Sequence, residues 1–441
     1  TDEGYISIDL GEGTSRRDVL KQLGAAGAAM GMAGAAGCQT ESDDSTPTSG
    51  GGGGGGGGGS EEVFNFARHP AVRPPGWDAS KTEGGSGNTE RTAIFVYQNS
   101  QNPFFVPMTV GFHDALENYG WTGQAIAPQA GIGGDAPTQA QLIRDNAISN
   151  LGEGDVLITT ILDTTNFNTA IQEALDNDIA VINGHTTPNP DDWNREFMMN
   201  EASGTGFDGG FTYRDQPMTI PHVGIQNERA GVAMAAEAYD RMQEANPDAD
   251  ELTVLVSNGL DVNPSVTRRV DKSAASRGTA QRYFESRSDP SVTLANGGEV
   301  LSTAPNTTGA ESDIESAVFL DSLDGVVSAG YWGAVGAGSL RDQGQLGDDV
   351  VVGGFDLEPR MIRSIQNGGA DFTVGQDPYS QGYMNVPLAW IYLERGMEMK
   401  TIEWGVSIWD ESNIDFADER RSWNALQNYQ EDNYDGIGPN F

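Results

Sequence analysis

The chain has 441 residues, with 64 acidic against 25 basic side chains and a formal net charge of −39. A surface this acidic repels nucleic acid and anionic lipid headgroups, so we expect neither as a partner. The single cysteine excludes an intramolecular disulfide, and the four histidines lack the paired spacing of a metal site. Acidic residues spread along the whole chain are typical of a halophilic protein, whose stability we expect to fall as salt is withdrawn.

The first 60 residues have the pattern of an export and anchoring segment. Arg16 and Arg17 precede a short, weakly apolar run, and the lone Cys38 follows it. This order predicts a twin-arginine signal peptide over residues 1–37 and a lipid attached to the cysteine. Ala35 departs from the pattern, because a leucine is usual three residues before a lipidated cysteine. We expect an extracytoplasmic protein held at the cell surface by a lipid anchor, or secreted free if the cysteine carries none.

Residues 38–90 are predicted to form a tether and an irregular lead-in. The run of glycines at 50–59 and the Ser, Thr and Asp around it favour a flexible coil that holds a folded body near the membrane. No later stretch of about 20 apolar residues predicts a membrane-spanning helix.

From residue 91 the hydrophobic pattern predicts alternating strands and helices, in two successive series. Short apolar runs that alternate with helices indicate βαβ units and parallel sheets. The two series therefore predict an α/β fold with two doubly wound lobes and a crevice at the carboxyl ends of their strands. The predicted strands are 92–97, 121–127, 155–160, 179–183, 252–256, 291–301, 325–329, 350–355 and 370–374. The predicted helices are 110–119, 139–150, 167–177, 230–245, 268–286, 313–322, 333–342, 358–367 and 381–395.

No motif in the chain predicts an enzyme or a cofactor. Residues 131–135, Gly-Ile-Gly-Gly-Asp, share two glycines with a dinucleotide-binding loop but lack the third spaced glycine, so we interpret them as an ordinary loop. The chain has neither a nucleophile elbow nor a phosphate-binding loop. We expect no catalytic residue.

Polar and aromatic side chains follow the predicted strands in both halves. The carboxyl ends of parallel strands share one edge, so these side chains should face one crevice. Amide, carboxylate and guanidinium groups make paired, directional hydrogen bonds, and aromatic faces cover apolar C–H surfaces. Such a set fits a small polyhydroxylated ligand such as a sugar. The candidate ligand-binding residues are Asn102, Phe104, Phe105, His185, Arg269, Tyr331, Asp356 and Gln376.

Five of these residues also have an ordinary structural explanation. Phe104 and Phe105 are typical core residues. Asp356 is suited to cap the helix that follows it, and Arg269 to lie on a solvated helix face. A loop position such as that of His185 is more often structural than ligand-binding. The case for a site rests on the recurrence of such residues at one edge of both sheets.

Three runs of the chain resemble the ribose-binding-protein-like family, the type I periplasmic sugar-binding proteins of ABC transporters. They are residues 102–105 (NPFF), 353–356 (GGFD) and 374–383 (VGQDPYSQGY). The resemblance extends over residues 91–405 in order and spacing. It implies two Rossmann-like lobes joined by a three-crossing hinge, which close on one sugar.

The resemblance also implies roles for particular residues. Asn102, Phe104 and Phe105 would contact the sugar ring from the first lobe. Asp356 and Gln376 would bond its hydroxyls from the second lobe and the hinge.

Three positions match the family less closely. Arg269 matches the family's arginine, although a second arginine is adjacent. His185 stands where the family usually has Asp or Asn. Gly330 stands where it usually has Asn, and Tyr331 and Trp332 follow it. These departures leave the identity of the sugar open.

The resemblance further predicts the limits of the lobes and hinges. Residues 186–221 form a longer segment than the family has, either a flap beside the cleft or a surface subdomain. The first lobe is expected at 91–225 and 377–405, the second at 226–376 and 406–441, and the hinges near 224–228, 375–379 and 403–407.

These observations predict a solute-binding protein of an ABC importer that captures a monosaccharide or similar polyol and delivers it to the transmembrane permease. We expect capture without catalysis, no cofactor, and a monomer. Two alternatives stay open. One is a tethered extracellular enzyme, either carbohydrate-active or an oxidoreductase. The other is a receptor for an autoinducer or nucleoside, linked to chemotaxis.

Overall fold

The computed structural model describes residues 90–130, 133–186, 212–213, 216–217, 220–260, 262–273, 279–317, 322–397, 399–415 and 417. The predicted signal peptide, Arg16, Arg17, Cys38 and the tether lie outside these residues, as does most of the segment 186–221. Predictions about them stay predictions. Among the described helices, none has the length and apolar character needed to cross a bilayer.

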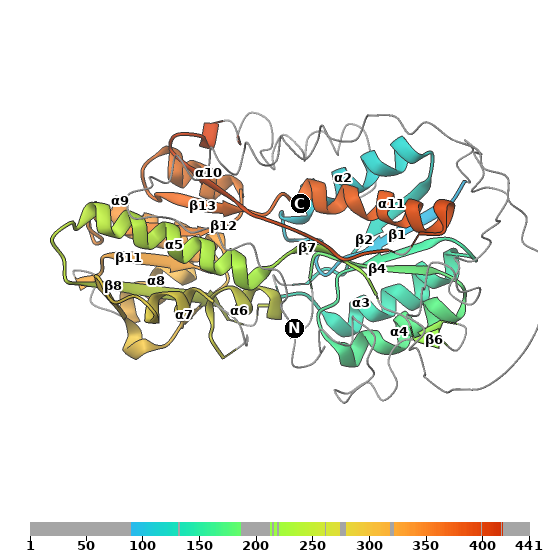
Figure 1. The fold of residues 1–441 in the computed structure, drawn as a ribbon, viewed down its shortest axis with the longest axis horizontal. Coiled ribbons are helices and arrows are strands. Elements are labelled where there is room, and N and C mark those ends of the chain that lie inside the picture. The colour runs from blue at the N-terminus through green and yellow to red at the C-terminus, as the bar shows by residue number, and fades with distance from the viewer. Residues whose placement is uncertain are drawn as a thin grey trace, which may run out of the picture. The chain divides into compact units, whose positions relative to one another are not determined.

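The first sheet has six parallel strands in the order β14-β7-β4-β3-β1-β2 (Figure 1). Strand β1 lies next to the edge of this sheet and pairs with β2 on one side and β3 on the other, so that Ile94 lies opposite both Gln124 and Leu157. The strands are β1 (Thr92–Val96), β2 (Thr122–Ile126), β3 (Val156–Thr159), β4 (Ala180–Gly184), β7 (His222–Ile225) and β14 (Ile402–Trp404).

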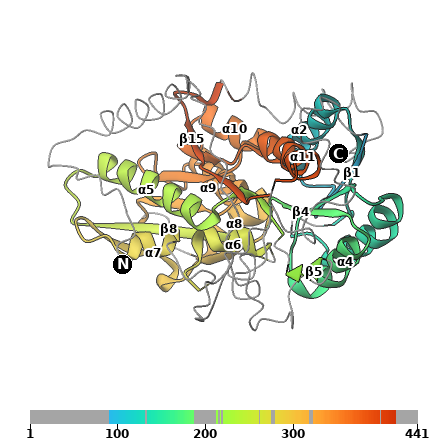
Figure 2. The same cartoon turned by 45° about the vertical axis from the view of Figure 1, so that its right-hand side comes forward.

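Helices cover both faces of this sheet because side chains alternate along each strand. Phe95 packs with α2 and α11 on one face, and its neighbours Ile94 and Val96 pack with α3 and α4 on the other. Figures 1 and 2 both show α2 beside α11. The helices are α2 (Phe105–Tyr119), α3 (Ala136–Leu142), α4 (Thr164–Asp176) and α11 (Pro378–Arg395).

The second sheet has the order β10-β8-β11-β12-β13-β15, and β9 pairs with the first half of β8. Its described pairings are parallel except that of β13 with β15. The strands are β8 (Glu251–Gly259), β9 (Ser291–Leu294), β10 (Leu301–Thr303), β11 (Gly325–Ser328), β12 (Val351–Phe355), β13 (Phe372–Gly375) and β15 (Ser407–Asp410).

Helices also cover both faces of the second sheet. Gly325 faces Met242 of α5, whereas Gly354 on the neighbouring strand faces Ala334 of α9. The helices are α5 (Asn227–Ala245), α6 (Pro264–Val270), α7 (Ala280–Glu285), α8 (Thr307–Ala317), α9 (Tyr331–Asp342) and α10 (Pro359–Gln366). Each lobe is thus a parallel-sheet α/β unit with its own core.

The chain passes between the two sheets three times: from β7 to α5, from β13 to α11, and from β14 to β15 (Figure 1). The predicted fold class, two Rossmann-like lobes with three crossings, is therefore confirmed. The crossings fall in the segments expected to act as hinges. The predicted limits of the lobes, and any motion about the hinges, stay predictions.

Two predicted elements are each divided in the structure. The predicted helix 268–286 is α6 and α7, because Asn263 and Pro264 start α6 early and Asp271, in extended conformation, ends it. The stretch 291–301, expected to hold one strand, contains β9 and the start of β10, separated by a short 3-10 turn. Sequence analysis did not predict the short strands at the crossings, β7, β14 and β15, or the two-residue pair β5 (Thr212–Tyr213) and β6 (Gln216–Pro217).

Candidate functional site

A buried arginine organises the second-lobe half of the candidate site. Arg269 lies in the last turn of α6 and is only 2% exposed. Its Nε donates to Asn227 Oδ1 at 3.0 Å, its Nη1 to the Ala329 carbonyl at 3.0 Å and its Nη2 to Gln376 Oε1 at 2.9 Å. The guanidinium also lies 4.4 Å from the centre of the Phe355 ring. These contacts fix the plane of the guanidinium. They also offset the free-energy cost of burying its charge.

Gln376 connects this arginine to a buried carboxylate. Its Nε2 donates to Asp356 Oδ1, while its Oε1 accepts from Arg269. The amide orientation is forced, because a guanidinium can only donate and a carboxylate only accepts. Among the described residues, no partner bonds the second carboxylate oxygen, Oδ2. The cluster therefore offers an acceptor oxygen to which a ligand hydroxyl can donate a hydrogen bond.

Burial changes the charge balance of this cluster. It raises the pKa of Asp356, against the opposing effects of the Arg269 charge and the Gln376 hydrogen bond. It lowers the pKa of Arg269 to about 10, so the guanidinium stays charged at neutral pH. Burial therefore makes ionisation of this carboxyl costly, and a ligand hydroxyl that donates to the carboxylate would offset part of that cost.

The place of Arg269 depends on close packing between α5 and α6. A methyl group on Gly231 of α5 would overlap the Arg269 carbonyl. Only glycine lets the two backbones approach this closely.

His185 organises the first-lobe half. It follows β4 with φ of 80°, a left-handed conformation that is unusual for a residue with a side chain. Its ring centre lies 4.5 Å from that of Phe104 and 6.0 Å from that of Phe105. Its Nδ1 is 2.8 Å from Gln381 Oε1. Nearby, Asn102 Oδ1 accepts from the Phe104 backbone N–H at 3.1 Å, which leaves its amide nitrogen without a partner among the described residues.

The remaining predicted residue, Tyr331, is engaged inside its own lobe. Its hydroxyl accepts a hydrogen bond from Arg360 at 2.9 Å, and burial raises its pKa to about 12. The adjacent Trp332 ring occupies the space that a side chain at Gly330 would need. The space beside Gly330 is therefore filled by the Trp332 indole.

Six of the eight predicted residues form two connected groups. Arg269, Gln376 and Asp356 are joined by hydrogen bonds, and His185 contacts Phe104 and Phe105. The sequence analysis missed three residues that bond predicted ones: Asn227 bonds Arg269, Arg360 bonds Tyr331, and Gln381 bonds His185. Of these, only Gln381 belonged to a motif, the run 374–383.

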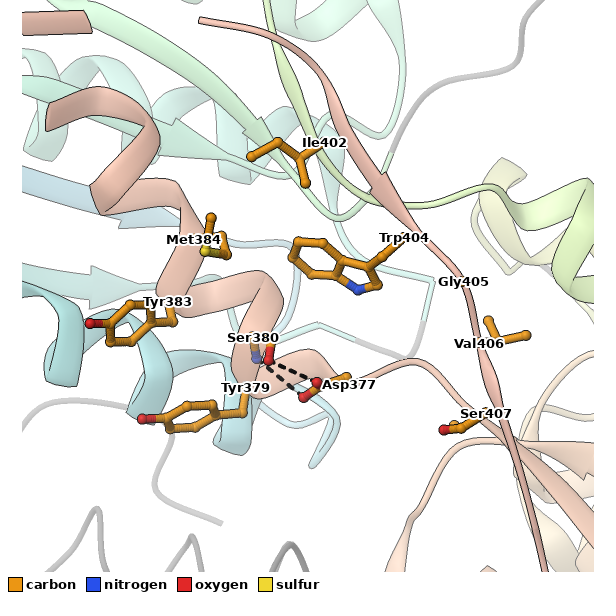
Figure 3. A pocket seen from close by; sticks show the side chains of 11 residues that line it. Asp377, Tyr379, Ser380, Tyr383, Met384, Ile402, Trp404, Gly405, Val406 and Ser407 are labelled. Carbon is orange, nitrogen blue, oxygen red and sulfur yellow. Dashed lines mark hydrogen bonds between the residues drawn. The ribbon is translucent and has the colours of Figure 1, made fainter. Parts of the chain in front are cut away.

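A separate cavity of about 650 Å³ lies at the second and third crossings (Figure 3). Residues of β13, α11 and the β14–β15 connection line it, among them Met384 and Trp404. Asp377 lies at its edge and caps α11 through Ser380. None of the predicted ligand-binding residues lines this cavity, so it is distinct from the candidate site. Among the described residues, no group of three or more His, Cys, Asp or Glu side chains is placed to hold a metal ion.

The sequence is similar to known proteins over most of the described chain. Residues 93–397 match the periplasmic binding protein domain family. The xylose/arabinose-binding protein XylF of Sulfolobus acidocaldarius is 24% identical over 312 residues, which cover 68% of this chain and 65% of that protein. The match thus spans less than two thirds of the length of this relative.

Solved structures share the fold. An ABC transporter solute-binding protein from Burkholderia graminis, in complex with D-arabinose, is 16% identical with a TM-score of 0.56, covering 74% of this chain and 98% of its own. A periplasmic ribose ABC transporter protein from Conexibacter woesei is 18% identical with a TM-score of 0.56, covering 78% and 100%. The family match extends over both lobes and all but the last crossing between them, and on that ground the chain belongs to the periplasmic binding protein family.

Proposed function

We propose that this protein is an extracytoplasmic solute-binding protein that captures a monosaccharide or similar polyol for an ABC importer. One observation carries the proposal. A buried arginine, amide and carboxylate are joined in one hydrogen-bonded cluster at the carboxyl edge of the second sheet, with an acceptor oxygen left open. Polar groups of this kind, fixed in orientation and short of one partner, are suited to bind sugar hydroxyls.

The proposed mechanism is capture by lobe closure. Phe104 and Phe105 would cover one face of the sugar ring from the first lobe, and Asn102 would donate to a hydroxyl through its amide nitrogen. Asp356 and Gln376 would bond other hydroxyls from the second lobe. A ligand held from both lobes favours the closed state by the contacts that it makes only there. The closed form would then be recognised by the permease.

The location of the protein is part of the same proposal. Arg16, Arg17 and Cys38 support export and a lipid anchor, which would keep the binding body beside the importer. Membership in the periplasmic binding protein family supports an extracytoplasmic place of action.

A sugar panel tests the function directly. Pentoses come first, because the relative in Sulfolobus acidocaldarius is named for xylose and arabinose. We expect at least one sugar to raise the melting temperature at high salt, by mass action on the folded state. Asp356→Ala and Gln376→Ala should abolish that rise while the variants remain folded.

The chain offers a matched control for these variants. Gln141 and Asp145 form an exposed amide–carboxylate hydrogen bond of 3.0 Å on the surface of the first lobe. Gln141→Ala and Asp145→Ala should leave the sugar effect unchanged. Normal binding by both site variants would contradict the site, and chemical turnover of the bound sugar would contradict capture in favour of an enzyme.

A further inference from the structure

A chain of hydrogen bonds connects the two groups of candidate ligand residues through α11. His185 Nδ1 lies 2.8 Å from Gln381 Oε1, and Gln381 Nε2 donates to the Gln376 carbonyl oxygen at 2.8 Å. Gln381 is fully buried, so neither end of its amide has water as an alternative partner. The two protein partners alone therefore determine which hydrogen bonds the amide makes.

Those partners fix the orientation of the Gln381 amide. The carbonyl of Gln376 can only accept a hydrogen bond, so the NH₂ group of Gln381 must face it. The amide oxygen must then face His185, and an oxygen can only accept. His185 must therefore donate from Nδ1, which makes Nδ1 the nitrogen that carries the proton.

The same surroundings keep the imidazole neutral. Its ring lies among Phe104 and Phe105, and burial lowers the pKa of His185 to about 3, helped by the positive charge of Arg269 and by His222 and opposed by the Gln381 hydrogen bond. A neutral imidazole that is protonated at Nδ1 has a bare lone pair at Nε2. Among the described residues, nothing bonds that nitrogen.

We propose that Gln381 is a positioning residue that holds His185 as its Nδ1–H tautomer, so that His185 presents only a hydrogen-bond acceptor to the ligand. This inference rests on the proposed sugar-binding function and adds a specificity rule to it. The sugar must place a donating hydroxyl at His185 Nε2. An amide or a protonated imidazole at this position could donate a hydrogen bond, and would therefore also bind a ligand group that only accepts.

The tautomer can be measured without any sugar. Proton–nitrogen correlation spectra of the imidazoles show which ring nitrogen carries the proton, and the chain has only four histidines to assign. We expect His185 to be protonated at Nδ1 in the native protein. Gln381→Met removes the amide at similar size and should move part or all of the population to Nε2–H.

Thr186→Val provides the matched control. Thr186 Oγ1 donates to Gln98 Oε1 at 2.8 Å, so this substitution also removes one buried hydrogen bond beside His185 without touching its ring. It should leave the tautomer unchanged. A native spectrum with His185 protonated at Nε2 would overturn the proposal, as would a Gln381→Met spectrum identical to the native one.

Fluorinated sugars test the consequence for binding. Fluorine is a weak hydrogen-bond acceptor and cannot donate. A deoxyfluoro sugar with fluorine in place of the hydroxyl that faces His185 therefore sets two acceptors, the fluorine and Nε2, against each other. The probes are D-xylose and D-arabinose with their monodeoxyfluoro derivatives. For the pentose that binds, we expect one fluorinated position to weaken native binding by about tenfold or more, in line with the loss of one buried hydrogen bond.

Substitution should reduce this discrimination at that position. In Gln381→Met the Nε2–H tautomer can donate to fluorine, so the difference should shrink to about threefold or less. His185→Phe keeps the ring packing on Phe104 and should lose the discrimination as well, which covers the case in which Gln381→Met does not fold. Equal discrimination in native protein and His185→Phe would overturn the acceptor role. If no sugar binds at all, the proposed function fails and the acceptor role with it, while the tautomer result still decides the Gln381–His185 part.

Discussion

Three residues at the candidate site and the crossings have left-handed backbones although none is glycine. They are His185, Asp356 and Asp377, with φ of 80°, 74° and 52°. This conformation costs roughly 1 to 2 kcal/mol for a residue with a Cβ atom. Two of the three belong to the candidate site and the third begins α11 at a crossing. Such conformations persist where the surrounding structure fixes them, which is frequent in binding sites.

Asp356 should destabilise the ligand-free fold while it strengthens sugar binding. Its pKa is raised by burial, so the ionised form destabilises the ligand-free fold at neutral pH. Asp356→Asn removes the charge at nearly constant shape. We expect a higher melting temperature without sugar and binding weakened by about tenfold or more, from the loss of a charge-assisted hydrogen bond. Calorimetric unfolding and titration measure the two effects, and a variant that is both less stable and fully binding would refute this account.

Binding should also depend on pH through Asp356. The free protein holds this proton more tightly than an ordinary aspartate, with a pKa above 3.8, and a sugar hydroxyl that donates to the carboxylate favours the ionised form. Affinity should therefore be constant above that raised pKa and fall as the pH decreases through it. Titrations at a series of pH values should show this fall in the native protein. In Asp356→Asn the profile should be flat over the same range, and a fall of equal size there would assign the titration to another group.

In unfolding experiments His185 should act in the opposite direction to Asp356, because its protonation destabilises the fold. Its pKa is about 3 when folded, against 6.5 when exposed, so the unfolded chain binds the proton first as the pH decreases. The stability contributed by the neutral imidazole is complete above pH 6.5 and is lost progressively towards pH 3. His185→Phe should reduce the acid slope of the free energy of unfolding, measured by denaturant titration between these values. An unchanged slope would mean that His185 is protonated in the fold.

At the scale of elements, the candidate site depends on how helices approach one another. Gly231 brings α5 against the backbone of Arg269. Gly231→Ala should push α6 away, weaken sugar binding by about tenfold and destabilise the fold by about 1 to 3 kcal/mol, the usual cost of overpacking. Gly152→Ala is the control, because a methyl group there meets only an ordinary contact with Asp155. Equal effects of the two substitutions would argue against this role for the α5–α6 contact.

Local sequence patterns predicted the long elements but not the short strands at the crossings. Long strands such as β8 and amphipathic helices such as α5 were predicted because burial imposes a periodic pattern along many residues. The strands at the crossings, β7 and β14, are only three or four residues long and are formed by pairing with distant segments. A pattern that short carries no period, so only the assembled sheet reveals it.

At the scale of the whole molecule, the net charge of −39 dominates the response to solvent. Like charges on one body repel one another, and salt screens that repulsion over a Debye length of about 10 Å at 0.1 M and about 3 Å at 1 M. We expect the melting temperature to fall steadily as salt is lowered from molar concentrations. The same series with sucrose in place of salt should not restore it fully, because sucrose does not screen charge. A melting temperature independent of salt would contradict the halophilic interpretation.

The sequence by itself determined the α/β class, the two series of strands and the identity of the residues at the strand ends. It did so because hydrophobic period and strand-end chemistry are local properties that each segment carries alone. The tertiary structure decided how those residues are connected. Asn227 and Gln381 lie far along the chain from Arg269 and His185, which they hold. Which amide faces which acceptor, and hence which nitrogen of His185 carries the proton, depends on three segments meeting at one place, and no local pattern contains that information.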